Sequence, residues 1–289
     1  MPTPLLLHHA SPLYKQLMTY VREKRLVFLA GLPGTGKSLW MHQLTHLATD
    51  AGRRVSLLQW DVARPVFEAH PVGQRYPVVD GVTHGVIRLA VGRWARQAVV
   101  DWHQQHVESQ NMLIGETPFI GHRLIELARV CDDAAEGLLS QEACVFVVPV
   151  PTAQVRRHIE AERRRRVSVP LHTQEREDAP PHVLQALWHE LVRIAPGLGV
   201  TVQGTIDQLP YDPVIYQGVY QALLKHRQVD VLCCETLLPT TTFSVYDFAS
   251  QPHLVSPTAE AVQRFIQEVE YAYPDGQVLQ RHLEHWYRV

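Results

Sequence analysis

Cysteine is scarce in this sequence, and the four cysteines present lack the spacing of a metal or redox motif. They are Cys131, Cys144 and the adjacent pair Cys233 and Cys234. Because no C-x-x-C pair occurs, we expect neither a zinc knuckle nor a disulfide framework, and a reducing compartment suits the chain. No apolar run reaches the ~18 residues that a membrane span requires. The N-terminus lacks the basic flank and the length of a signal peptide, so we expect a cytoplasmic protein with no membrane partner.

An excess of one charge is also missing. The 289 residues carry a formal net charge of −2, with 19% charged and 46% hydrophobic residues. A phosphate backbone attracts strongly basic chains, so this balance gives no reason to expect a nucleic-acid partner. The sequence shows no internal repeat, no low-complexity segment and no linker long enough to divide it. We therefore expect a single domain spanning residues 1–289.

The most informative stretch is residues 31–38, which match the P-loop pattern G-x-x-x-x-G-K-S/T at every fixed position. The apolar run at 26–30 predicts a buried strand before it, and residues 39–47 have the apolar spacing of a helix after it. Strand, glycine-rich turn and helix are the context that this motif requires. A glycine-rich strand-to-helix turn without a ligand is the alternative.

A P-loop binds phosphates through backbone N–H groups that its glycines allow to approach closely, and the helix N-terminus adds positive potential. Lys37 is expected to reach the β- and γ-phosphates, and the Ser38 hydroxyl to ligate Mg²⁺. The sequence therefore predicts ATP and Mg²⁺ as ligands. The residues expected to line the nucleotide are Gly31, Leu32, Pro33, Gly34, Thr35, Gly36, Lys37, Ser38 and Leu39.

Apolar runs alternate with helical periodicity along the rest of the chain. Further strands are expected at 54–60, 111–116, 143–150 and 230–235. Helices are expected at 11–24, 83–108, 121–130, 133–139, 152–166, 182–194, 213–226, 258–270 and 276–286, and the proline-rich stretch 62–80 reads as a loop. This alternation predicts an α/β fold, a P-loop NTPase three-layer sandwich with about five parallel strands and helices on both faces.

Two carboxylates follow predicted strands and are candidates for phosphoryl-transfer chemistry. Asp61, after the second strand, suits a base that faces an acceptor hydroxyl, and its alternative is a helix N-cap. Glu116, after the third strand, suits an acid that holds Mg²⁺ directly or through water, and its alternative is a turn residue beside Pro118. Arg123 either faces the same site or is a solvated surface residue.

Arginine gathers in the segment that follows the fourth strand. A solvated helix balanced by acidic neighbours is one interpretation. The other is a lid at about 152–181 whose guanidinium groups close over the phosphates and exclude water, with Arg163 as a catalytic candidate. The cluster consists of Arg156, Arg157, Arg163, Arg164, Arg165 and Arg166, and the acidic stretch 175–178 beside it argues against nucleic-acid binding.

The P-loop, Asp61, Glu116 and the arginine-rich segment resemble the P-loop kinases of the nucleoside and nucleotide kinase superfamily. The order of Asp61, Pro71 and a long following helix is also similar to the zeta-toxin and antibiotic-phosphotransferase branch. In that branch an aspartate after the second strand activates a hydroxyl, which implies that role for Asp61. An arginine follows the third-strand acid in deoxynucleoside-kinase-like members, whereas Thr117 follows Glu116 here.

Three functions fit these motifs. The first is an ATP-dependent kinase that phosphorylates a hydroxyl of a small molecule. The second is a P-loop NTPase that hydrolyses ATP as a switch or regulatory module without such an acceptor, and the third is a nucleotide-binding regulator without turnover. The absence of N-K-x-D and of D-x-x-G after a strand argues against a GTPase. The lack of a paired acid after an apolar strand argues against a ring-forming ATPase.

Overall fold

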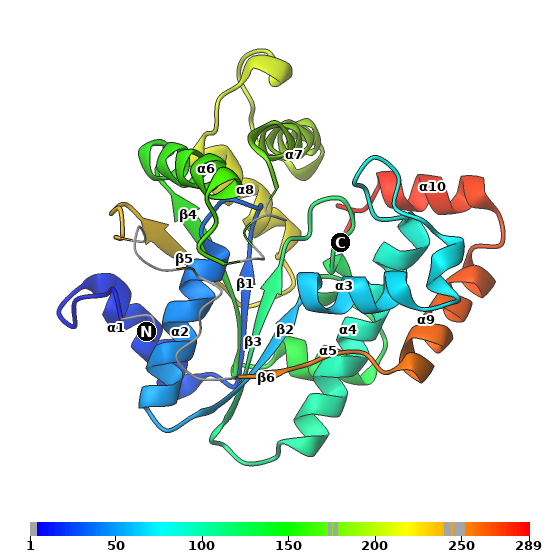
Figure 1. Cartoon of the computed structure of the whole chain (residues 1–289), viewed down its shortest axis with the longest axis horizontal. Coiled ribbons are helices and arrows are strands. Elements are labelled where there is room, and N and C mark those ends of the chain that lie inside the picture. The colour runs from blue at the N-terminus through cyan, green and yellow to red at the C-terminus, as the bar shows by residue number, and fades with distance from the viewer. Residues whose placement is uncertain (1–4, 173–174, 176–178, 240–243, 245–251) are drawn as a thin grey trace.

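Parallel pairing joins all the strands of the sheet, which contains β1 (Leu26–Ala30), β2 (Arg54–Gln59), β3 (Asn111–Thr117), β4 (Cys144–Pro151), β5 (Val229–Cys234) and β6 (His253–Leu254). Their order across the sheet is β5-β4-β1-β3-β2-β6 (Figure 1). The computed structural model describes residues 5–172, 175, 179–239, 244 and 252–289. The five expected strands are confirmed. The sixth, β6, was not expected because two exposed residues form no apolar run.

Helices flank the sheet, as the alternating pattern predicts. Ser11 caps the first helix, its side chain accepting a hydrogen bond from the Tyr14 N–H, as its position before Pro12 indicates. The helices are α1 (Pro12–Glu23), α2 (Lys37–Asp50), α3 (Trp60–Ala69), α4 (Gly85–Gln105), α5 (Ala134–Ser140), α6 (Ala153–Ser168), α7 (Pro181–Ile194), α8 (Pro213–Leu223), α9 (Ala259–Ala272) and α10 (Gly276–Glu284). In the part of the chain that the structure describes, none of them is both long and apolar enough to cross a membrane.

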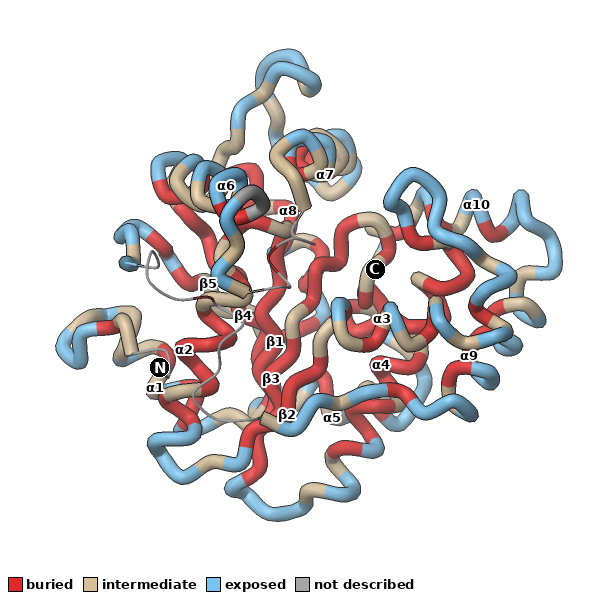
Figure 2. Tube along the Cα trace, viewed as in Figure 1, coloured by how far each residue is buried: buried red, intermediate tan, exposed pale blue. Residues whose placement is uncertain are grey.

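Alternate residues of β1 serve two separate apolar cores, one on each face of the sheet. Leu26 and Phe28 belong to the larger core, which α4, α8 and α9 cover. Val27 and Leu29 belong to the smaller core, which α1 and α2 cover. All of β1 is therefore buried, and Figure 2 shows the central strands as a continuous buried layer. This burial holds the end of β1, where the P-loop begins, in a fixed place.

The expected loop at 62–80 is wrong in its first part, because α3 begins directly after β2. Trp60, Ala63 and Phe67 are buried at helical spacing along α3, and this burial outweighs the disruptive effect of a proline. Pro65 lies inside the helix and has no N–H, so the Asp61 carbonyl loses its partner within the helix. Because α3 begins at Trp60, Asp61 lies in its first turn and Gln59 takes the N-cap position.

The expected helix at 121–130 is also wrong, since only the short 3₁₀ turn Ile125–Leu127 forms there. Phe119, His122 and Leu124 adopt positive φ angles, a conformation that no α-helix contains. Arg96 donates to the Glu126 carbonyl at 2.6 Å, taking a hydrogen bond that a helical amide would otherwise supply. The loop after β3 is thus shaped by distant side chains.

Candidate functional site

The loop between β1 and α2 contains two glycines in the left-handed conformation. Gly34 and Gly36 have φ angles of +80° and +87°, which side chains other than glycine rarely adopt. Gly36 is also the N-cap of α2, and no side chain there caps the first N–H groups of the helix. Those unpaired N–H groups and the helix dipole favour an anion at this point.

Lys37 is the buried cation of this loop. Its Nζ donates to the Leu32 carbonyl at 3.0 Å and lies 3.3 Å from Glu116 Oε1. Burial lowers the pKa of Lys37, the carboxylates of Glu116 and Asp61 oppose that shift, and the charge of Arg163 adds to it. Four of the five side chains that the sequence singled out for catalysis or Mg²⁺, all except Ser38, therefore interact electrostatically at one place.

The register of the sheet explains this convergence. Glu116 of β3 lies between Leu29 of β1 and Gln59 of β2. Asp61 follows Gln59 by two residues, and the P-loop follows β1, so both lie beyond the carboxyl ends of adjacent strands. Ligands of open α/β sheets bind at that edge.

Asp61 has an electrostatic environment suited to proton transfer. Water reaches its side chain, yet the surrounding protein buries it enough to raise its pKa. The nearby charge of Glu116 raises the pKa of Asp61 further, whereas Arg64, Lys37 and Arg123 lower it. The net shift is upward, which makes the ionised carboxylate a stronger base than a surface aspartate.

The arginine cluster divides into residues that contact the P-loop region and residues that do not. Arg156 is buried and donates to the Pro33 carbonyl at 3.0 Å and to Glu160 at 2.7 Å. Arg163 interacts electrostatically with Lys37. The solvated-surface interpretation holds for Arg157 and Arg164, which are exposed.

The remaining two arginines of the cluster pair with acids. Arg165 lies 2.9 Å from Glu162, and buried Arg166 lies 2.6 Å from Glu175. Residues 173–174 and 176–178 of the expected lid segment lie outside the described residues. The part of the segment that the structure describes thus includes a buried anchor at Arg156 and a buried ion pair at Arg166.

Of the charged groups near Asp61, sequence reasoning singled out Arg123 and missed Arg64, Arg88 and Glu190. Arg64 on α3 and Arg123 after β3 both influence the pKa of Asp61, and Glu190 on α7 influences the pKa of Arg123. Arg88 on α4 completes this group, because its charge and that of Glu190 act on each other. The residues come from four elements far apart in the chain, so no local spacing could reveal them.

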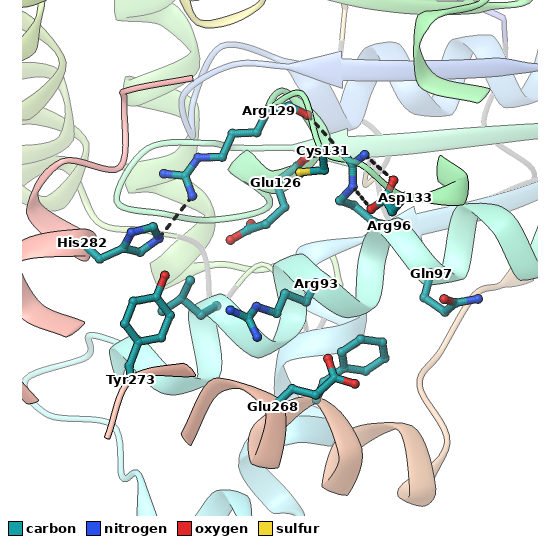
Figure 3. A pocket seen from close by; sticks show the side chains of 12 residues that line it. Arg93, Arg96, Gln97, Glu126, Arg129, Cys131, Asp133, Glu268, Tyr273 and His282 are labelled. Carbon is teal, nitrogen blue, oxygen red and sulfur yellow. Dashed lines mark hydrogen bonds and ion pairs between the residues drawn. The ribbon is translucent and has the colours of Figure 1, made fainter. Parts of the chain in front are cut away.

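A cavity of about 330 Å³ lies elsewhere, between α4, α9 and the loop after β3, and none of the P-loop residues lines it (Figure 3). Its polar side chains bind largely one another. Arg96 pairs with Asp133 at 2.6 Å, and Arg129 contacts the His282 ring at 3.2 Å. Glu126, also in this cavity, accepts from or donates to His122 at 2.6 Å according to the proton's position. The network supports the loop that places Arg123.

Among the described residues, no three His, Cys, Asp or Glu side chains gather as metal ligands. The expectation of Mg²⁺ rests instead on the Ser38 hydroxyl in the first turn of α2.

The chain matches no model of a protein family, no curated protein and no solved structure in the comparisons made with it.

Proposed function

We propose that this protein is a kinase that transfers the γ-phosphoryl group of ATP to a hydroxyl of a small molecule, with Mg²⁺. The observation that carries the proposal is the ion pair between Lys37 of the P-loop and Glu116 at the end of β3. Asp61 and Arg163 interact electrostatically with the same lysine. A P-loop cation, two carboxylates and an arginine are the parts that phosphoryl transfer needs.

The residues present fit a triphosphate. The uncapped start of α2 and the positive φ angles of Gly34 and Gly36 suit phosphate oxygens, which accept hydrogen bonds from backbone N–H groups. Lys37 has a carboxylate partner that phosphate can replace. Ser38 would hold Mg²⁺, with Glu116 acting on it directly or through water, and the ion would neutralise charge on the β- and γ-phosphates.

The reaction follows from the positions of the carboxylates. Asp61 accepts the proton of the acceptor hydroxyl as the hydroxyl oxygen forms a bond to the γ-phosphorus. The bond between that phosphorus and the oxygen that bridges it to the β-phosphate breaks, and ADP leaves. Lys37 and Arg163 stabilise the charge that gathers on the transferred group and on ADP.

We further propose that α6 is the arginine-bearing lid of the site. Arg156 anchors its first turns to the P-loop through the Pro33 carbonyl. Arg163, two turns further along, supplies a positive charge near Lys37. A lid of this kind excludes water, so that transfer to the acceptor outcompetes hydrolysis.

Product analysis tests the proposal. The protein is incubated with Mg²⁺, γ-labelled ATP and a mixture of small metabolites, and the labelled products are separated. We expect label in a phosphorylated small molecule, and far less of this product from Asp61→Asn in the same time. Label in free phosphate alone would support the switch-like NTPase instead, and unconsumed ATP would support a nucleotide-binding regulator.

A further inference from the structure

Two arginines and one glutamate converge over Gly121 in the loop after β3. A Cβ placed on Gly121 would lie 3.5 Å from Arg123 Nη1, 3.6 Å from Arg88 Nη1 and 3.8 Å from Glu190 Oε1. Gly121 has a φ angle of +62°, a conformation that also disfavours side chains. These distances are ordinary van der Waals contacts, so the three side-chain atoms gather around one point above Gly121, between α4, α7 and the loop.

The positive charge of this group is not neutralised by close ion pairs. Among the described residues, no carboxylate oxygen lies within 4.0 Å of a nitrogen of Arg88 or Arg123, the two residues that we call the cationic pair. Arg88 Nη1 donates to the Gly121 carbonyl at 2.5 Å, and Arg123 Nη1 donates to the Ile120 carbonyl at 3.2 Å. Backbone carbonyls orient the two guanidinium groups without cancelling their charge.

Burial makes this arrangement unfavourable for the protein alone. It lowers the pKa of Arg123, and the charge of Arg64 lowers it further, while Glu190 and Asp61 act in the opposite direction. For Arg88, burial again lowers the pKa, and the charge of Arg123 adds to that effect. Arg88 Nε is buried and has no hydrogen-bond partner. Partly buried like charges and an unused donor are what a bound anion would stabilise.

The neighbouring charges do not supply this anion. Glu190 is a single carboxylate, and burial raises its pKa. Glu68 lies 3.3 Å from Arg64 and accepts from Thr83, so it is engaged on α3. Asp61 is the carboxylate that we assign to proton transfer, and its charge interacts with that of Arg123. Arg123 of the cationic pair therefore lies near the proposed base.

We propose that the cationic pair binds an oxyanion of the acceptor, either a phosphate or a carboxylate group, so that the substrate is an anionic small molecule. The identification of this anion as part of the phosphoryl acceptor rests on the proposed kinase function. The oxyanion site itself depends only on Arg88, Arg123 and the convergence of their Nη1 atoms over Gly121. Each guanidinium can donate two parallel hydrogen bonds to such a group.

Calorimetric titration with inorganic phosphate tests the site. A Lys37→Ala background removes the P-loop cation, so that phosphate bound there does not obscure the result. In that background, Arg123→Gln should weaken phosphate binding by about tenfold or more, as expected for a lost charge-assisted hydrogen bond. Arg264→Gln, which removes an exposed arginine on α9, should leave binding unchanged. Acetate titrated in parallel distinguishes a carboxylate site from a phosphate site.

Glu190→Gln should change the phosphate affinity in the opposite direction, which a misfolded variant would not do. The substitution removes the carboxylate whose charge acts on both arginines, so phosphate should bind more tightly, whereas a damaged fold would weaken its binding. Arg123→Lys, which keeps the charge, should bind phosphate better than Arg123→Gln. Equal binding of both anions by Arg123→Gln and Arg264→Gln would overturn the inference even if phosphoryl transfer occurs. Phosphate binding at the pair without any transfer would contradict the proposed function instead.

Discussion

Asp61 combines access to water with a pKa that burial and Glu116 raise, the properties of a base held ready in its ionised form. The Asp61→Asn substitution should leave ATP affinity nearly unchanged, because in the proposed reaction the residue faces the acceptor and not the triphosphate. The rate of transfer should fall by ~10²–10⁴-fold, the usual contribution of a general base. Nucleotide titration and single-turnover kinetics measure the two effects. Asp132→Asn, on the exposed surface, is the matched control and should alter neither.

Substitution of Glu116 should affect the Mg²⁺ requirement of the reaction rather than the proton transfer from the acceptor hydroxyl. In Glu116→Gln the Mg²⁺ concentration needed for half-maximal rate should rise, because a charged partner of the ion is lost. The rate at saturating Mg²⁺ should recover substantially. If Glu116→Gln stays inactive at saturating Mg²⁺ while Asp61→Asn transfers at the parent rate, the two roles are reversed.

The raised pKa of Asp61 also predicts how stability depends on pH. A carboxyl group with a raised pKa in the folded state binds its proton more tightly there than in the unfolded chain. Its ionisation therefore destabilises the fold above that raised pKa, and the penalty disappears below the unfolded value of about 3.9. Asp61→Asn should raise the free energy of unfolding in urea at pH 7, and the gain should shrink as the pH approaches 4. Equal stability of Asp61→Asn and Asp132→Asn at pH 7 would contradict this account.

Single residues were predictable from sequence where the signal is local. Lys37 and Ser38 belong to one motif, and Asp61 and Glu116 follow apolar strands, so each stands out without knowledge of the fold. Of the cationic pair, Arg123 stands out because it follows Glu116 in the same stretch, but Arg88 does not. Arg88 is one polar residue on a largely buried helix, and only the packing of α4 against the loop after β3 brings it to Arg123.

At the scale of elements, α6 is attached to the P-loop by the side chain of Arg156. Its guanidinium group stacks on the Tyr211 ring, 5.4 Å from the centroid, and bonds Pro33 and Glu160. Arg156→Ala should lower the free energy of unfolding by about 1–3 kcal/mol, because it leaves buried polar partners unpaired. Arg157→Ala, one residue along on the exposed face, should change it by less than about 0.5 kcal/mol.

Denaturant unfolding of both variants measures this difference, and ATP titration measures its consequence. We expect Arg156→Ala to bind ATP more weakly than Arg157→Ala, since the loop carbonyl that Arg156 holds lies within the P-loop. Equal stability and equal ATP affinity of the two variants would show that α6 is not anchored through Arg156.

Two elements illustrate where local patterns mislead. Residues 60–69 carry a proline, which favours a loop, but Trp60 and Phe67 enter the core and form a helix. Residues 121–130 have helical composition, but Arg96 and Arg227 bind the carbonyls of Glu126 and Leu127. In both cases tertiary contacts outweigh the local conformational preference, and the local sequence pattern does not indicate these contacts.

At the scale of the whole molecule, buried parallel strands were predictable because each is a continuous apolar run bounded by polar residues. Their order across the sheet was not, since it depends on which helices cover which face. That order places β3 between β1 and β2, and therefore Glu116 between the P-loop and Asp61. The candidate site is a consequence of this register as much as of the motif.

The central claim is that residues 31–38 bind the triphosphate of ATP through Lys37. Calorimetric titration of ATP with Mg²⁺ into the parent protein, Lys37→Ala and Lys225→Ala tests it directly, because Lys225 is an exposed lysine outside the site. The account predicts tight binding by the parent and by Lys225→Ala, and binding at least about tenfold weaker by Lys37→Ala. Indistinguishable affinities of all three proteins, or no binding by the parent, would contradict it.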